Sequence, residues 1–183
     1  WSLVTDPWFS GDAGMVSGPN DGTVYNAAFD QVSPRLDYQV TFNRTGTHYI
    51  VLRGWGETSN DDSCHVGING QGNITADRIA GFNGPSLQWS SKTMDFDMEN
   101  GVFFIAQVAI PSAGLHTVNI WMREDGLHLD KVILSTNPSF IPSGEGPPES
   151  LPDAPPPDEP YGVMITTLSM SNGMICGEFQ PLP

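Results

Sequence analysis

Proline is concentrated in one part of this chain. Nine of the 16 prolines in the 183-residue sequence lie between residues 138 and 160. Because proline lacks a backbone N–H donor and fixes φ, such a segment cannot pair within a sheet. The sequence therefore predicts a domain over residues 1–137, an extended linker over 138–160 and a tail over 161–183.

Alternation of apolar and polar residues is the main pattern before the prolines. Apolar residues at 36, 38, 40 and 42 alternate with polar residues at 35, 37, 39 and 41, which predicts a strand over 35–42. No segment shows a sustained helical period with caps. We therefore expect an all-β, antiparallel β-sandwich, with further strands over 48–54, 63–68, 103–110, 117–122 and 127–134.

The charge of the chain excludes several classes of partner. There are 21 acidic residues against seven lysines and arginines, for a formal net charge of −14. Nucleic acid and anionic membrane surfaces are disfavoured, since both attract basic proteins. No apolar run approaches the length of a membrane span. The composition favours a secreted, extracellular or cell-surface protein, and the start at Trp1 indicates a removed leader or a fragment of a longer chain.

The two cysteines allow two interpretations. Cys64 lies in a predicted strand and Cys176 lies in the tail. They are two unrelated buried thiols, or they form a disulfide that locks the tail onto a sandwich, either its own or that of a neighbouring copy.

Several of the predicted strands resemble a known family. Arg35–Val40, Tyr49–Gly54, Ser63–Gly70 and Trp121–Val132 resemble the galactose-binding-like, jelly-roll β-sandwiches of carbohydrate-binding module families 6 and 35. The resemblance covers about residues 1–150. It is more specific for the fold than for any ligand.

The resemblance has two implications for the start of the chain. Such modules open with a strand that carries glutamates, and here that strand would precede Trp1 and is absent. The family commonly binds a structural calcium through those glutamates and an aspartate on the last strand. Asp130 matches the aspartate, so calcium is the cofactor that the resemblance implies, although its glutamate partners have no counterpart here.

An absent strand and a β-prone tail together predict strand donation. The missing strand would leave an exposed edge, which invites pairing with another chain. The tail residues expected to fill that slot are Val163, Met164, Ile165, Leu168 and Met170. We expect a non-catalytic structural subunit that assembles with copies of itself, head to tail, into a filament. The sequence does not forbid insertion of the tail into its own domain.

The alternative function is that of a carbohydrate-binding module from a larger secreted protein that acts on polysaccharide. Aromatic rings in loops stack on sugar faces, and nearby polar groups orient the hydroxyls. The candidate glycan-binding residues are Tyr25, Trp55, Asn83, Trp89, Asp125 and His128.

Catalytic motifs are not found in the sequence, so we expect no enzymatic activity. There is no nucleophile elbow, phosphate-binding loop or dinucleotide fingerprint. The four histidines are scattered over separate strands. Asn43 and Asn73 each begin an Asn-x-Thr triplet, which makes them candidate N-glycosylation sites.

Overall fold

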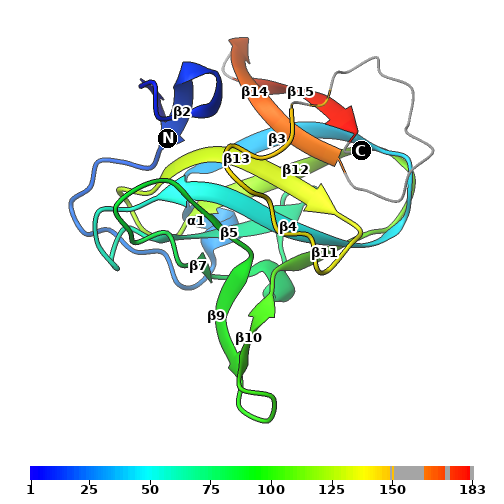
Figure 1. Cartoon of the computed structure of the whole chain (residues 1–183), viewed down its shortest axis with the longest axis horizontal. Coiled ribbons are helices and arrows are strands. Elements are labelled where there is room, and N and C mark those ends of the chain that lie inside the picture. Colours follow the sequence, from blue (N-terminus) through cyan, green and yellow to red (C-terminus); the bar gives the residue numbers. More distant parts are fainter. Residues whose placement is uncertain (149, 151–162, 172–173, 182–183) are drawn as a thin grey trace.

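The computed structural model describes residues 1–148 and 150, together with the backbone of residues 163–171 and 174–181. Two antiparallel sheets pack face to face as a β-sandwich (Figure 1). The all-β sandwich predicted from the sequence is confirmed. Helical structure within the described residues is confined to short turns, namely α1 (Phe29–Val32), η1 (Ser10–Asp12) and η2 (Ile74–Ala76).

The first sheet contains both ends of the described chain. It consists of β1 (Ser2–Thr5), β2 (Ala13–Val16), β4 (Gly46–Trp55), β8 (Gln88–Ser90), β11 (Gln107–Ile110), β13 (His128–Ser135), β14 (Val163–Ser171) and β15 (Met174–Pro181).

The second sheet runs in the order β10-β9-β7-β5-β12-β3, with β6 beside β5. Its strands are β3 (Arg35–Phe42), β5 (Ser63–Ile68), β6 (Gln71–Gly72), β7 (Ile79–Ala80), β9 (Lys92–Asp97), β10 (Val102–Ile105) and β12 (Gly114–Met122).

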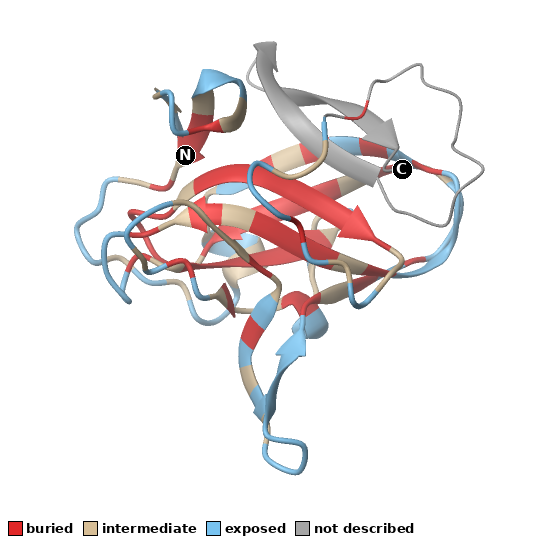
Figure 2. Cartoon of the chain, viewed as in Figure 1, coloured by how far each residue is buried: buried red, intermediate tan, exposed pale blue. Residues whose placement is uncertain are grey.

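Period-two alternation builds the core between the sheets. On β3 the apolar residues are buried, whereas their neighbours face outward (Figure 2). The opposing layer comes from alternate residues of β4, β11 and β13. The largest core side chains from the two sheets include Leu36, Phe42, Ile50, Leu52, Ile110 and Ile120.

One predicted strand is in fact two. Residues 103–110 were expected to form a single strand, but β10 belongs to the second sheet and β11 to the first. The chain changes sheet at Ala106, which is fully buried. Its N–H donates to the Ser91 carbonyl, and its own carbonyl accepts from the Ile50 N–H. The chain therefore crosses the core at this point without glycine or proline.

Both edges of β13 pair with strands of this chain. One side of β13 pairs with β4. On the other side, β2 pairs with His128 and Leu129, while β14 pairs with Val132–Leu134. The predicted donor strand thus pairs with its own domain, and nothing in the structure supports a head-to-tail filament. The side chains of the predicted donor residues lie outside the described residues, as do residues 151–162.

The beginning of the proline-rich segment packs on the sandwich. Phe140 packs against Val51 and Ile133 on the outer face of the first sheet. The Trp89 indole Nε1 donates to the Gly144 carbonyl at 2.9 Å, and Lys131 Nζ donates to the Glu145 carbonyl at 2.7 Å. Residues 138–146 therefore cover this sheet. The predicted division into domain, linker and tail stays a prediction.

Candidate functional site

An aromatic cavity lies where the N-terminal segment meets the ends of β4 and β13. Its volume is about 200 Å³. The lining is mostly apolar, with one carboxylate and one imidazole. It consists of Val4, Asp6, Trp8, Phe9, Trp55, Leu87 and His128.

Four rings give the cavity its shape. The Trp8 and Trp55 rings meet edge to face, with centroids 6.2 Å apart and planes at 79°. The His128 ring lies 5.1 Å from that of Trp55 and 6.3 Å from that of Phe9. Trp8 is 59% exposed, whereas Phe9 is buried. A ligand can therefore reach the Trp8 indole directly.

The inner rings are held by hydrogen bonds from neighbouring loops. Trp55 Nε1 donates to the Gly84 carbonyl at 2.6 Å. His128 Nδ1 lies 3.0 Å from the Gly126 carbonyl. Since a carbonyl can only accept, Nδ1 carries the proton and Nε2 is free to accept. The two rings are thereby held in fixed orientations before any ligand arrives.

A buried ion pair fixes the N-terminal side of the cavity. Arg53 Nη1 lies 2.5 Å from Asp130 Oδ2, and the Ser10 N–H donates to Asp130 Oδ1 at 2.8 Å. Burial raises the pKa of Asp130, and the hydrogen bond and charge of Arg53 oppose that rise. Because Ser10 follows Trp8 and Phe9 directly, this carboxylate anchors the segment that carries both rings.

The contacts of Asp130 also concern the calcium site that the family resemblance implies. Both oxygens of Asp130 already have protein partners, so a calcium ion there would have to displace Arg53. Among the residues that the structure describes, no group of three or more histidine, cysteine, aspartate or glutamate side chains is placed to hold a metal. Calcium binding stays a prediction.

The cavity brings together Trp55 and His128 out of the six predicted glycan-binding residues. Asn83 forms a backbone bridge with Gly56, outside the lining. Trp89 instead secures residues 140–146, as described above.

The other two predicted glycan-binding residues, Tyr25 and Asp125, lie outside the cavity lining and make hydrogen bonds within the fold. Tyr25 is part-buried and lies in a loop whose backbone bonds to Arg123 and His65. Asp125 is fully buried, and its Oδ2 accepts from the Asp21 N–H at 2.5 Å.

Sequence reasoning missed the N-terminal half of the cavity. Asp6, Trp8 and Phe9 were not among the candidates, although two adjacent aromatic residues after Pro7 are an unusual feature in a polar loop. Exposed aromatic residues of this kind are a signal for binding. Val4 and Leu87 gave no such signal, because isolated aliphatic residues occur on any surface.

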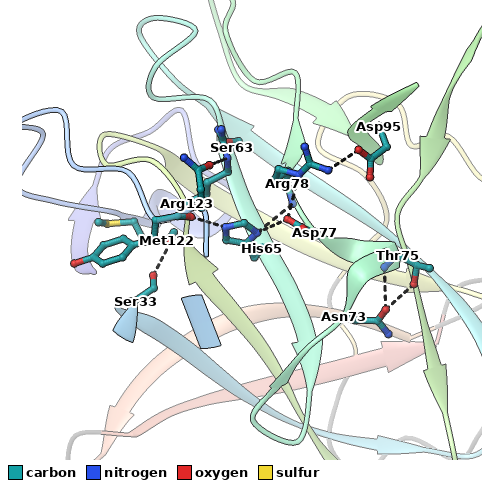
Figure 3. A network of polar contacts seen from close by, with 12 residues as sticks. Ser33, Ser63, His65, Asn73, Thr75, Asp77, Arg78, Asp95, Met122 and Arg123 are labelled. Atoms are coloured by element: carbon teal, nitrogen blue, oxygen red, sulfur yellow. Dashed lines mark hydrogen bonds and ion pairs between the residues drawn. The ribbon is translucent and has the colours of Figure 1, made fainter. Parts of the chain in front are cut away.

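A second polar cluster surrounds His65 on the outer face of the second sheet (Figure 3). The imidazole is buried and stacks on Phe29, with ring centroids 3.8 Å apart and planes at 3°. Its Nε2 donates to the Tyr25 carbonyl at 2.8 Å. Its Nδ1 lies 2.8 Å from Asp77 Oδ1 and 3.2 Å from the Arg78 backbone nitrogen.

Burial lowers the pKa of His65, and the bonds to Tyr25 and Asp77 oppose this only in part. A protonated Nδ1 would donate to Asp77, and an unprotonated one would accept from the Arg78 N–H. The cluster links β5, the Tyr25 loop and the turn before β7 around a buried imidazole, which is a structural role.

The remaining candidates stay predictions. Cys64 is fully buried, which raises the pKa of its thiol, and the side chain of Cys176, its predicted disulfide partner, lies outside the described residues. Asn43 is exposed between β3 and β4. The Asn73 side-chain Oδ1 accepts from the Thr75 N–H at 3.0 Å and from the Thr75 hydroxyl at 2.7 Å.

Comparison with known families identifies the domain. The model of the glycosyl hydrolase family 115 C-terminal domain matches residues 11–149. This chain belongs to that family. The matched region of this family 115 C-terminal domain runs past β13 and includes the segment that packs over the first sheet.

A curated relative of this family 115 C-terminal domain comes from Formosa agariphila. It is named "Uncharacterized protein P23" and is 34% identical over 119 residues. The match covers 64% of this chain and 29% of the relative. The chain thus spans under a third of that protein's length.

Solved structures similar to this family 115 C-terminal domain come from enzymes that act on carbohydrates. The exo-β-1,3-galactanase of Phanerochaete chrysosporium matches with a TM-score of 0.42 and 15% identity, over 73% of this chain and 25% of its own. A Paenibacillus cycloisomaltooligosaccharide glucanotransferase matches with a TM-score of 0.42 and 16% identity, over 70% of this chain and 18% of its own. A Podospora anserina mannanase with a family 35 carbohydrate-binding module matches with a TM-score of 0.41 and 18% identity, over 84% of this chain and 32% of its own.

No helix within the described part of the chain is long and apolar enough to cross a membrane.

Proposed function

We propose that this chain is a non-catalytic, carbohydrate-binding domain of a larger secreted protein that acts on polysaccharide. Membership of the glycosyl hydrolase family 115 C-terminal domain family supports this class of function. The sandwich would then act as a module of the kind found in carbohydrate-binding families 6 and 35. Its part in the larger protein is to hold polysaccharide near a catalytic domain.

The observation that carries the proposal is the exposed face of Trp8 beside Trp55. Sugar rings present C–H groups on one face, which pack on an indole, and hydroxyls at the edge, which need polar partners. His128 Nε2 and the Asp6 carboxylate are the polar groups of the lining that can accept from those hydroxyls. The volume of about 200 Å³ is suited to one sugar ring, so we expect binding to a chain end or a single residue of a glycan.

The lining also supports a preference for uncharged sugars. Asp6 is the charged side chain of the lining, and its charge has the same sign as the −14 of the chain. Arg53, two residues before Trp55 on β4, is paired with Asp130. A uronate would therefore meet repulsion with no arginine or lysine of the lining to receive it.

The experiment is retention of the purified chain in native gels that contain soluble neutral polysaccharides, followed by calorimetry on the best ligand. Trp8→Ala should abolish retention, Trp8→Phe should retain part of it, and Leu115→Ala, at an exposed apolar position on β12, should leave it unchanged. Equal retention of the Trp8→Ala variant and the parent chain would refute the proposed site. Absence of retention on every polysaccharide would refute the proposed function.

A further inference from the structure

The β9–β10 hairpin projects from the sandwich (Figures 1 and 2). It exposes large apolar side chains. All four residues of β10 are exposed, and the turn residue Met98 is 86% exposed. The exposed set, apart from Met98, is Met94, Phe96, Val102, Phe103, Phe104 and Ile105. A patch of this density on a soluble domain marks an interaction surface.

Strand register gives the hairpin one face without acidic side chains. The opposite face carries Asp95 and Asp97, together with Val102, the register partner of Asp97. Phe96 pairs with Phe103, and their rings meet edge to face at 5.0 Å, while Lys92 pairs with Ile105. These four residues share one face. Asp95, at an alternate position, forms an ion pair with Arg78 on the other face. The apolar face thus carries a single charge, that of Lys92 at its base.

The chemistry of this apolar patch indicates which class of partner can bind it. Phenylalanine, methionine and isoleucine offer no hydrogen bonds to sugar hydroxyls, so a glycan is disfavoured. Asp97 and Glu99 lie at the tip of the hairpin, and the chain is strongly acidic, so an anionic membrane is disfavoured. A protein surface remains.

A second copy of this chain fits the arrangement of charge. When two hairpins pack antiparallel about a twofold axis, the base of each lies beside the tip of the other. Lys92 of one copy then faces Glu99 of its partner, and the acidic faces point away from each other.

We propose that the β9–β10 hairpin is the contact of a symmetric homodimer. The contact is isologous, so it closes after two copies and forms no filament. A half-exposed large side chain offers roughly 100 Å². The four apolar side chains of this face on each copy, Met94, Phe96, Phe103 and Ile105, bury about 800 Å² in total, as in a weak, transient interface, so the dimer dissociates on dilution.

Sedimentation equilibrium of the purified chain over a wide concentration range tests the proposal. The parent chain should pass from monomer to dimer, and Phe103→Ser should raise the dissociation constant about tenfold or more. Leu115→Ser, at an exposed position on β12, is the matched control and should leave the dissociation constant unchanged. Thermal melting of each variant separates loss of contact from loss of fold.

A charge swap tests the antiparallel arrangement. Lys92→Glu and Glu99→Lys should each weaken the dimer, and the double variant should restore it, because the opposing pair is re-formed. A monomer at every concentration would overturn the proposal. So would a dimer that tolerates Phe103→Ser, or association seen only with another protein. None of these outcomes depends on glycan binding, so the proposed function stands or falls separately.

Discussion

Trp55 and His128 are register partners on β4 and β13, and their rings lie 5.1 Å apart within the candidate cavity. The ladder between these two central strands therefore sets the geometry of the site. Side chains on adjacent strands of a packed sheet are held more exactly than side chains on loops. The other side of the site is formed by the N-terminal segment, which adds Trp8 and Asp6.

Asp6 is expected to select against acidic sugars. Asp6→Asn removes the negative charge of the lining, so binding to a uronate-bearing glycan should increase relative to its neutral counterpart, by about threefold to tenfold at low salt. Calorimetry on the two glycans gives the ratio. Glu99→Gln removes the same charge at the hairpin tip and should leave the ratio unchanged. Equal ratios for both variants would show that Asp6 does not set the preference.

The Arg53–Asp130 pair is expected to stabilise the fold far more than the Arg35–Asp37 pair. Arg53→Ala leaves a buried carboxylate unpaired, which should lower the free energy of unfolding by about 3–5 kcal/mol. Arg35→Ala breaks a part-exposed pair and should cost about 1 kcal/mol or less. Urea denaturation at neutral pH provides both values. Similar losses for the two variants would contradict this assignment.

His65 is expected to make the fold less stable as pH falls. Its folded-state pKa is lowered below the ordinary value of 6.5, so the unfolded chain binds the proton more readily. The stability is fully present above pH 6.5 and is lost as pH falls through and below that value. The pKa of His48 is lowered by burial as well, so both histidines contribute. Thermal melting at a series of pH values should show a smaller slope for His65→Gln than for the parent. An unchanged slope would refute the role of His65.

Gly14 is expected to be essential for the position of Phe9. A Cβ at residue 14 would lie 2.6 Å from the Phe9 ring and 2.9 Å from the Leu129 carbonyl oxygen. Gly14→Ala should therefore displace Phe9, weaken glycan binding and lower stability by about 1–3 kcal/mol. At Gly18 nothing lies within 4 Å of the added Cβ, so Gly18→Ala is the control. Thermal melting and gel retention of the Gly14→Ala and Gly18→Ala variants test this prediction, and equal behaviour of the two would contradict it.

Deletion of residues 161–183 is expected to leave the domain folded. The described backbone of β14 pairs with only three residues of β13, whereas β4 pairs along most of that strand. The truncated chain should therefore unfold at a modestly lower temperature and keep the same association state. Long polymers in the intact protein that vanish on truncation would instead revive the filament hypothesis.

Local pattern predicted the central strands well. The bounds of β3 and β5 agree with the sequence prediction, because each strand is bounded by clear turns and has one face against the core. The pattern could not show that the strand expected over 103–110 divides at Ala106. A change of sheet depends on what lies above and below the chain, and no glycine or proline marks it.

Only part of the candidate site could be predicted from the sequence, for a related reason. Trp55 and His128 were found because they lie at the ends of recognisable strands. Trp89 had the same sequence signal, but Gly144 and Phe140 bring it into a structural contact that is distant in sequence. Asp6 and Trp8 act together with residues more than 40 positions away, and this relationship exists only in the folded chain.

The contacts of Trp89 and Lys131 with residues 144 and 145 change the point at which the proline-rich segment leaves the sandwich. A stiff spacer orients what it carries from the point where it leaves its support. Here that point lies no earlier than Ser150, which is fully buried, and not at the end of β13. At least nine residues, 138–146, or about 27 Å of extended chain, are thus withdrawn from the spacer's reach. They are held by the same sheet that carries Trp55 and His128.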